Sequence, residues 1–193
     1  RIGSSEDNNQ RKKDRTGNMK KVVKFGGSSL ASAEQFKKVG NIIRSDAERK
    51  FVVPSAPGKR NDKDTKVTDM LYGCYALADA GQDFHGELQA IRDRYQQIID
   101  GLELPLSLKE EFAQIEKQFK EKAGSNYAAS RGEYLNGIIM SAYLGFEFVD
   151  AADVIYFDEN GEFDPDRTND VLSARLAGCE SGLIPCFYGC MTD

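Results

Sequence analysis

Apolar and polar residues follow two patterns along this chain, and each pattern predicts one kind of element. Short runs rich in β-branched and aromatic residues are typical of strands. Such runs occupy residues 22–25, 51–54, 146–150, 154–157 and 183–188. Elsewhere apolar residues recur every three or four positions, the spacing of one helix face. This spacing predicts helices over about 32–48, 84–99 and 108–122, with others starting near 68, running through 133–143 and running through 172–176.

Strands and helices alternate along most of the chain, which is typical of the α/β fold class. We therefore expect a three-layer α/β/α sandwich, in which a mostly parallel central sheet is covered by helices on both faces. The consecutive helices between about 68 and 143 depart from this alternation. They predict a separate, lid-like helical layer.

Hydroxyl residues mark three of the expected helix starts. Ser32 with Gln35, and Ser107 with Glu110, have the spacing of a capping box, in which two side chains satisfy backbone donors of the first turn. Thr168 is expected to cap the helix that follows it.

Residues 1–18 are polar and show no apolar periodicity, so they cannot contribute to a core. We interpret them as a disordered leader or an appended segment, and residues 19–193 as one domain. A basic arm for nucleic acid is the alternative. It is disfavoured because its positive run is short and is interrupted by Asp14.

The composition excludes several classes of protein. The 193 residues carry a formal net charge of -5 and show no basic face, so nucleic acid is not an expected partner. No apolar run is long enough to span a membrane, and no signal peptide is visible. The cysteines, Cys74, Cys179, Cys186 and Cys190, lack paired metal-binding spacing. We interpret the last two as buried thiols, and a reducing, cytoplasmic compartment fits best.

The first predicted strand ends at a pair of glycines, Gly26 and Gly27, which are followed by two serines and then a helix. Two glycines let the backbone bend sharply and let a ligand approach without a Cβ in the way. The amides of such a turn, with a helix N-terminus behind them, form an anion site. Lys24 could add an ammonium group there. A tight turn beside a surface lysine is the simpler alternative, and the turn by itself favours it.

The string Lys-Phe-Gly-Gly-Ser-Ser at 24–29, a few residues after Met19, resembles the opening signature of the aspartate kinases, members of the amino acid kinase superfamily. Two later segments resemble the same family, in the same order. In the first, residues 53–71, Ser55 and Thr68 match positions that line the amino-acid substrate site. In the second, the Gly-Glu pair ending at Glu133 matches a motif whose glutamate holds the substrate's ammonium.

This resemblance implies an activity. The γ-phosphoryl group of ATP would pass to the side-chain carboxylate of L-aspartate and give 4-phospho-L-aspartate, the first step of lysine, threonine and methionine biosynthesis. Lys24 would neutralise the transferring phosphoryl group, while the Gly26 and Gly27 amides and the Ser28 hydroxyl would hold phosphate oxygens. Mg²⁺ would be held mainly by the ATP phosphates and water. The resemblance also implies a homo-oligomer at full length.

Structural alternatives exist for each substrate residue. Ser55 has the place of an ordinary turn hydroxyl, and Thr68 that of a helix N-cap. Glu133 stands at an expected helix start and has capping-box spacing from Ser130, which would satisfy backbone donors without any ligand. The sole histidine, His85, is expected at the surface of a helix start. The aspartates between 150 and 166 could bind a metal, but solvated loops explain them better.

The resemblance covers the N-terminal part of an aspartate kinase catalytic domain only. The family's later glycine-rich segment, with its arginine and aspartate, is not present in 19–193, so we expect this chain alone to have little or no activity. Another superfamily member, acting on glutamate, acetylglutamate, carbamate or a nucleotide, is one alternative function. A non-catalytic ligand-binding module is the other. Neither a Walker A nor a GxGxxG motif is present.

Overall fold

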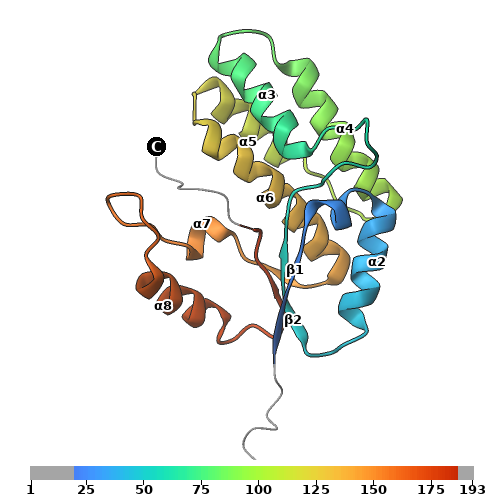
Figure 1. Cartoon of the computed structure of the whole chain (residues 1–193), viewed down its shortest axis with the longest axis vertical. Helices are drawn as coiled ribbons and strands as arrows, with labels where there is room; N and C mark the ends of the chain where they lie inside the picture. Colours follow the sequence, from blue (N-terminus) through green and yellow to red (C-terminus); the bar gives the residue numbers. More distant parts are fainter. Residues whose placement is uncertain (1–19, 187–193) are drawn as a thin grey trace, which may run out of the picture.

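Parallel strands form the centre of the computed structural model, which describes residues 20–186 (Figure 1). The described strands pair in the order β1-β2-β4-β3, and every pair is parallel. Their bounds are Lys21–Phe25 for β1, Arg49–Pro54 for β2, Glu147–Phe148 for β3 and Gly182–Leu183 for β4. The predicted parallel sheet is therefore confirmed.

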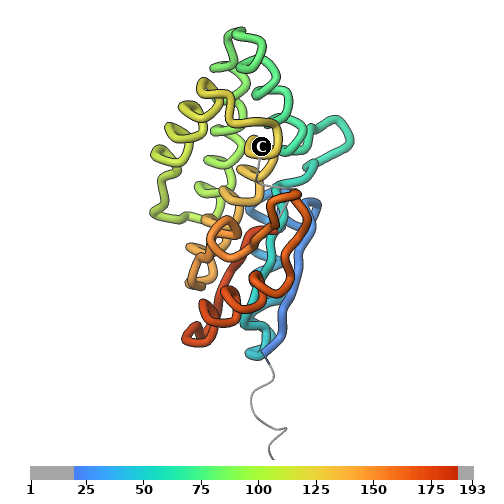
Figure 2. The backbone as a smooth tube through the Cα atoms, turned by 90° about the vertical axis from the view of Figure 1, so that its left-hand side faces the viewer, coloured from blue at the N-terminus to red at the C-terminus, as the bar shows by residue number. Residues whose placement is uncertain are grey.

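Helices cover both faces of this sheet. Helices α2 (Ala33–Arg44) and α6 (Ser125–Leu144) lie on one face, and α7 (Ala151–Val154) and α8 (Pro165–Leu176) lie on the other (Figures 1 and 2). The apolar face of α2 is buried through Phe36, Val39 and Ile43, which join Val52 of β2 in one core cluster. This arrangement confirms the three-layer α/β fold.

A second group of helices lies beyond the carboxyl ends of β1 and β2 (Figure 1). It comprises α3 (Val67–Asp79), α4 (His85–Gly101) and α5 (Lys109–Lys120), with the first half of α6. Aromatic side chains fill the space between these helices; the Tyr75 and Phe119 rings, for example, meet edge to face at 5.3 Å. The predicted helical layer is therefore present, and it lies where ligands bind in α/β sheets.

The long helix α6 connects the two layers because small residues let it come close to both. A Cβ placed on Gly132 would lie 2.8 Å from the Cβ of Ala56, and one placed on Gly137 would lie 2.8 Å from Pro185 Cγ. Ala128 and Ala129 of the same helix are also buried. These contacts leave no room for a side chain, so the glycines determine how closely α6 packs.

The start of α6 corrects an expectation from the sequence. The helix begins at Ser125, well before Glu133, so Ser130 and Glu133 lie in its middle and not at a helix start. The Ser130 hydroxyl donates to the Tyr127 carbonyl (2.8 Å) and caps nothing. The capping-box alternative for Glu133 is therefore wrong. The early turns were missed because their buried residues are small and give little hydrophobic periodicity.

The remaining cap predictions have mixed outcomes. Ser32 caps α2 as expected, accepting a hydrogen bond from the Gln35 amide (3.4 Å). Ser107 instead accepts from the Lys109 amide (3.3 Å), and Leu108 precedes α5, so that capping box is wrong.

The cap of α8 is also not the expected one. Asp164 caps this helix by accepting from the Arg167 amide, and Pro165 occupies its first turn. Thr168 lies inside the helix, and its hydroxyl accepts from the Tyr156 amide (2.9 Å). The cap prediction for Thr168 is therefore wrong.

Several predicted boundaries also differ. Helix α2 ends at Arg44, earlier than expected, because β2 already begins at Arg49. The strand expected over 154–157 is absent from the described residues there, since α7 occupies its start and Phe157 lies in an isolated bridge with Phe163.

Other expectations fall at the ends of the chain. Cys186 is only partly buried, not fully as expected. The expectations for residues 1–18, for the last part of the strand at 183–188 and for Cys190 lie outside the described residues.

The loops after β1 and β2 touch through two glycines. The Gly58 amide donates to the Gly27 carbonyl (2.8 Å), and the Ser55 amide donates to the Phe25 carbonyl (3.0 Å). A Cβ on Gly58 would lie 2.7 Å from the Gly27 carbonyl carbon. Residues without side chains are therefore needed where the two backbones meet.

We predict that Gly58→Ala lowers the free energy of unfolding by about 1–3 kcal/mol, because the added methyl group overpacks this contact. Urea denaturation of the purified chain would measure the loss. Gly26→Ala is a matched control, since Gly26 has a φ of -80° and a Cβ there meets nothing within 4 Å. Equal losses in the two variants would contradict the close-contact explanation.

Candidate functional site

The two glycine loops and the middle of α6 meet at the carboxyl end of the sheet, where ligands bind in open α/β folds, and we call this meeting place the crevice. The loop after β1 contains Gly26, Gly27 and Ser28, and the loop after β2 contains Ser55. Hydrogen bonds between the two loops hold them together.

One turn of α6 holds the peptide group between Ser55 and Ala56 at both of its polar ends. The Ala56 amide donates to Glu133 Oε1 (3.3 Å), and Asn136 Nδ2 donates to the Ser55 carbonyl (2.6 Å). Glu133 and Asn136 are three residues apart, so they lie on the same face of the helix. Because the carbonyl needs a donor, it fixes the orientation of the Asn136 amide and leaves Oδ1 facing elsewhere.

Two buried acceptors remain without a partner in this turn. Glu133 Oε2 and Asn136 Oδ1 accept no hydrogen bond from any residue of 20–186, although the two residues are 1% and 0% exposed. A buried polar atom without a partner costs about 1–3 kcal/mol, and more when it is charged. Both atoms therefore suit a ligand that brings several N–H donors.

The environment of Glu133 also disfavours its charge. Burial raises the pKa of the Glu133 carboxyl, while the backbone amides of Glu133 itself and of Ala56, and then the nearby Ser55 hydroxyl, oppose this rise. A cation at Oε2 would favour the charged form and lower the pKa again.

Thr68 lies in the first turn of α3, close to α6. Its Oγ1 is 3.8 Å from the position of a Cβ placed on Gly132. The residue that precedes α3 is Lys66, and no side chain caps this helix, so the alternative of Thr68 as an N-cap is wrong. The start of α3 is instead attached to the second loop, because the Val67 amide donates to the Pro57 carbonyl (3.1 Å).

Lys24 and Ser28 lie on either side of the glycine pair, and both are exposed. Within residues 20–186, the Lys24 ammonium forms no ion pair or hydrogen bond, in contrast to Lys21, which pairs with Asp46 (2.9 Å). The Gly26 side of the turn is open, as no atom lies within 4 Å of a Cβ placed there. A free cation and an open glycine turn fit an anionic ligand.

Helix α4 supports both walls of the crevice through adjacent residues, which the sequence analysis missed. Arg94 Nη2 donates to the Gly58 carbonyl (2.8 Å), and Nη1 lies 3.0 Å from Asp64 Oδ2. The Tyr95 hydroxyl donates to the Gly132 carbonyl (2.7 Å). Burial, and secondly the charge of Glu133, raise the pKa of Tyr95 well above its usual value. No local motif marks these residues, although Asn136 could have been found from its spacing to Glu133.

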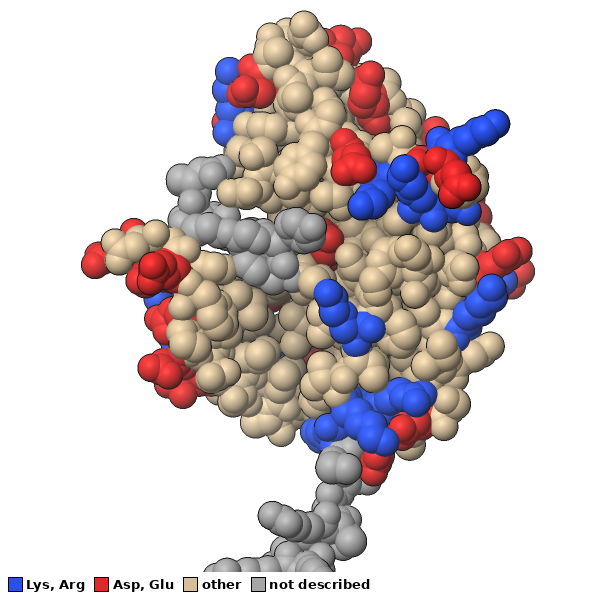
Figure 3. Space-filling view, in the orientation of Figure 1, with Lys and Arg blue, Asp and Glu red and all other residues tan. Residues whose placement is uncertain are grey.

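Other candidate chemistry is weaker. His85 lies exposed at the start of α4, as expected, and its Nδ1 is 2.6 Å from Asp83. No group of three or more histidine, cysteine, aspartate or glutamate residues within 20–186 could hold a metal ion. Acidic side chains gather over the α7–α8 segment, whereas charges of both signs are mixed elsewhere on the face in Figure 3. None of the helices described between 20 and 186 has the length and apolar content needed to cross a membrane.

A family model described as "Amino acid kinase family" matches residues 19–193. The chain belongs to the amino acid kinase family. Aspartokinase 3 of Bacillus subtilis is 39% identical over 137 residues, which are 68% of this chain and 30% of that relative. The aspartate kinase crystal structure from Clostridium acetobutylicum shares 47% identity and a TM-score of 0.84, over 87% of this chain and 39% of that one. The resemblance to aspartate kinases is therefore confirmed.

A more distant structure supports the fold alone. Aspartokinase III of E. coli, solved with aspartate and ADP, is 22% identical and has a TM-score of 0.67 over 85% of this chain and 40% of that one. This member of the amino acid kinase family therefore spans less than half the length of the relatives it matches.

We predict that Glu133→Gln stabilises the unliganded chain at neutral pH. Because burial raises the pKa of Glu133, the folded protein binds this proton more tightly than the unfolded chain, and the free energy of unfolding falls as the pH rises through the folded-state pKa. Glutamine keeps the acceptor for the Ala56 amide and carries no charge. Urea denaturation at pH 7 should show a gain of about 1 kcal/mol or more.

The gain should disappear as the pH falls below the unfolded-state pKa of glutamate, about 4.3, because the side chain is then protonated in both states. Glu180→Gln, at an exposed position, serves as the control and should change stability little at either pH. A loss of stability in Glu133→Gln at pH 7 would show that the carboxylate stabilises the fold.

Proposed function

We propose that this chain forms the aspartate-binding part of an aspartate kinase, which transfers the γ-phosphoryl group of ATP to the side-chain carboxylate of L-aspartate. The observation that carries the proposal is the pair of buried, unpaired acceptors, Glu133 Oε2 and Asn136 Oδ1, beside the two glycine loops. The identity to aspartokinases from Bacillus and Clostridium supports the choice of substrate.

The substrate ammonium would donate to Glu133 Oε2 and to Asn136 Oδ1. An ammonium carries three donors, so it can satisfy two acceptors at once, and its charge compensates the buried carboxylate. The hydroxyls of Ser55 and Thr68, from the loop after β2 and the start of α3, would bind the rest of the amino acid. The two hydrogen bonds between α6 and the Ser55–Ala56 peptide would hold the Ser55 side of this site in place.

The phosphoryl side of the reaction would use the loop after β1. The acceptor carboxylate is already a nucleophile, so the reaction needs positioning and charge neutralisation and no general base. The Gly26 and Gly27 amides and the Ser28 hydroxyl would hold phosphate oxygens, and Lys24 would neutralise developing charge. The open side of Gly26 and the unpaired Lys24 ammonium fit this role. Mg²⁺ would be bound by the ATP phosphates and by water, and it would add positive charge to this side of the site.

The compartment, the oligomeric state and the pathway of the enzyme are proposed on separate grounds. The cysteines of the described part, Cys74, Cys179 and Cys186, are free thiols, which supports a reducing compartment such as the cytoplasm. The family resemblance supports a homo-oligomer at full length and a place at the entry to lysine, threonine and methionine biosynthesis. These assignments rest on the aspartate kinase proposal.

We predict that Lys24→Ala lowers kcat at least roughly a hundredfold, as the loss of one preorganised charge contact does. A coupled ADP-release assay on the longest natural form of the protein would measure it. Lys37→Ala removes another exposed lysine, on α2, and should leave kcat near normal. A near-normal kcat in a folded Lys24→Ala variant would exclude Lys24 from the mechanism.

Glu133→Gln should lower kcat/KM for aspartate by about 2–4 kcal/mol of transition-state stabilisation, because it removes the charge opposite the ammonium. The KM for ATP should change little. N-acetyl-aspartate, which lacks the ammonium, is the matched substrate: its weak turnover should be the same in both proteins. Unchanged aspartate kinetics in Glu133→Gln would refute the amine-binding role and weaken the assignment of substrate.

A further inference from the structure

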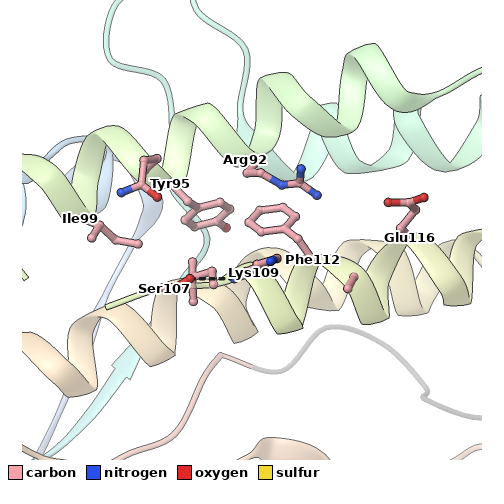
Figure 4. Close-up of a pocket in the computed structure, with 10 residues that line it drawn as sticks. Arg92, Tyr95, Ile99, Ser107, Lys109, Phe112 and Glu116 are labelled. Carbon is pink, nitrogen blue, oxygen red and sulfur yellow. Dashed lines mark hydrogen bonds between the residues drawn. The ribbon is translucent and has the colours of Figure 1, made fainter. Parts of the chain in front are cut away.

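A cavity of about 350 Å³ lies between α4 and α5, apart from the crevice that holds Glu133 (Figure 4). Its apolar wall is formed by buried side chains of both helices and of the segment between them. These are Tyr95, Ile99, Leu108 and Phe112, which are between 0% and 5% exposed. The Tyr95 and Phe112 rings meet there at 6.2 Å with an angle of 58° between their planes. A cavity of this size and lining can accept a small organic ligand.

The cations of this cavity have no anionic partner among residues 20–186. Arg92 lies with its guanidinium 5.2 Å from the centre of the Phe112 ring, and its only hydrogen-bond acceptor within residues 20–186 is the neutral side chain of Gln89 (3.1 Å). Its Nε is buried and has no hydrogen-bond partner in the described part of the chain. Lys109, at the start of α5, forms no ion pair within the described part of the chain.

The one carboxylate in the wall is already compensated. Glu116 pairs with the Lys120 ammonium at 2.6 Å and lies 3.4 Å from His85 Nε2. The hydrogen bond from Lys120 holds the pKa of Glu116 below its usual value. The cavity therefore offers unpaired positive charge beside an aromatic wall, and an anion with an apolar body fits both.

We propose that this cavity binds a small amphiphilic carboxylate, with its anionic group at Arg92 and Lys109 and its apolar body against Tyr95 and Phe112, and that binding alters the Gly132–Glu133 segment through Tyr95. Tyr95 belongs to both places. Its ring lines the cavity, and its hydroxyl donates to the Gly132 carbonyl at 2.7 Å.

The neighbouring residue of α4 strengthens this connection. Arg94 donates to the Gly58 carbonyl (2.8 Å) and pairs with Asp64 (3.0 Å). A shift of α4 by a ligand would therefore act on both walls of the crevice. Binding in the cavity does not rest on the proposed kinase function; only an effect on turnover does.

The test uses 3-phenylpropionate as the probe and 3-phenylpropan-1-ol as its uncharged match, added to the chain with labelled methyl groups and amides. We expect 3-phenylpropionate to bind with a Kd on the order of 1 mM and to shift the Ile99 and Leu108 methyl signals. The alcohol should bind to the unsubstituted chain at least about tenfold more weakly than the acid. The acid should bind to Arg92→Gln at least about tenfold more weakly than to the unsubstituted chain, because each change removes a charge-assisted contact. Arg167→Gln, which removes another arginine stacked on an aromatic ring, should bind the acid normally.

The connection to the crevice has its own variant. Tyr95→Phe keeps the ring in the cavity and removes the hydroxyl, so binding should persist while the ligand-induced shift of the Glu133 amide is lost. Absence of shifts at Ile99 and Leu108, or equal binding of acid and alcohol by the unsubstituted chain, would overturn the ligand site. A Glu133 response that persists in Tyr95→Phe would overturn the transmission through Tyr95.

Discussion

The two hydrogen bonds between α6 and the Ser55–Ala56 peptide group are the constraint on which the rest of the crevice depends. Glu133 and Asn136 hold the amide and the carbonyl of the Ser55–Ala56 peptide, so the loop after β2 cannot turn without breaking both bonds. That loop in turn meets the glycine turn after β1 through Gly58. One helical turn therefore determines the relative position of the two segments that would receive the amino acid and the phosphates.

The same two hydrogen bonds leave part of the polar capacity of this turn unused. Each of the two α6 side chains uses one polar atom on the peptide, and its other polar atom is buried and has no partner among the described residues. Such an arrangement costs stability in the absence of a ligand and returns it on binding. Helix α4 of the helical layer helps to hold the crevice together, because Arg94 and Tyr95 donate hydrogen bonds to the carbonyls of Gly58 and Gly132. It is a structural support of the crevice and not only a cover.

The sequence predicted those parts of the molecule whose signals are local. The first two strands, the glycine turn and the parallel α/β fold follow from β-branched runs, glycine pairs and the alternation of elements. The start of α6 was missed because its buried residues are small, and this error made Glu133 look like a helix cap. Asn136 could have been found from its spacing to Glu133, whereas Arg94 and Tyr95 could not be assigned because their roles are contacts with segments far away in the chain. The catalytic and binding roles of Lys24, Gly26, Gly27, Ser28, Ser55, Thr68 and Glu133 stay predictions.

The glycines of α6 have a consequence for any attempt to recombine this domain. Gly132 faces Ala56 of the second loop, and Gly137 faces Pro185, which follows β4, with no space for a methyl group at either place. A chimera that took α6 from another protein would therefore have to take both facing segments with it. The loop at Ala56, helix α6 and the segment at Pro185 therefore form one exchangeable unit, although they are distributed over residues 56–185, whereas the outer faces of α4 and α5 could be replaced independently.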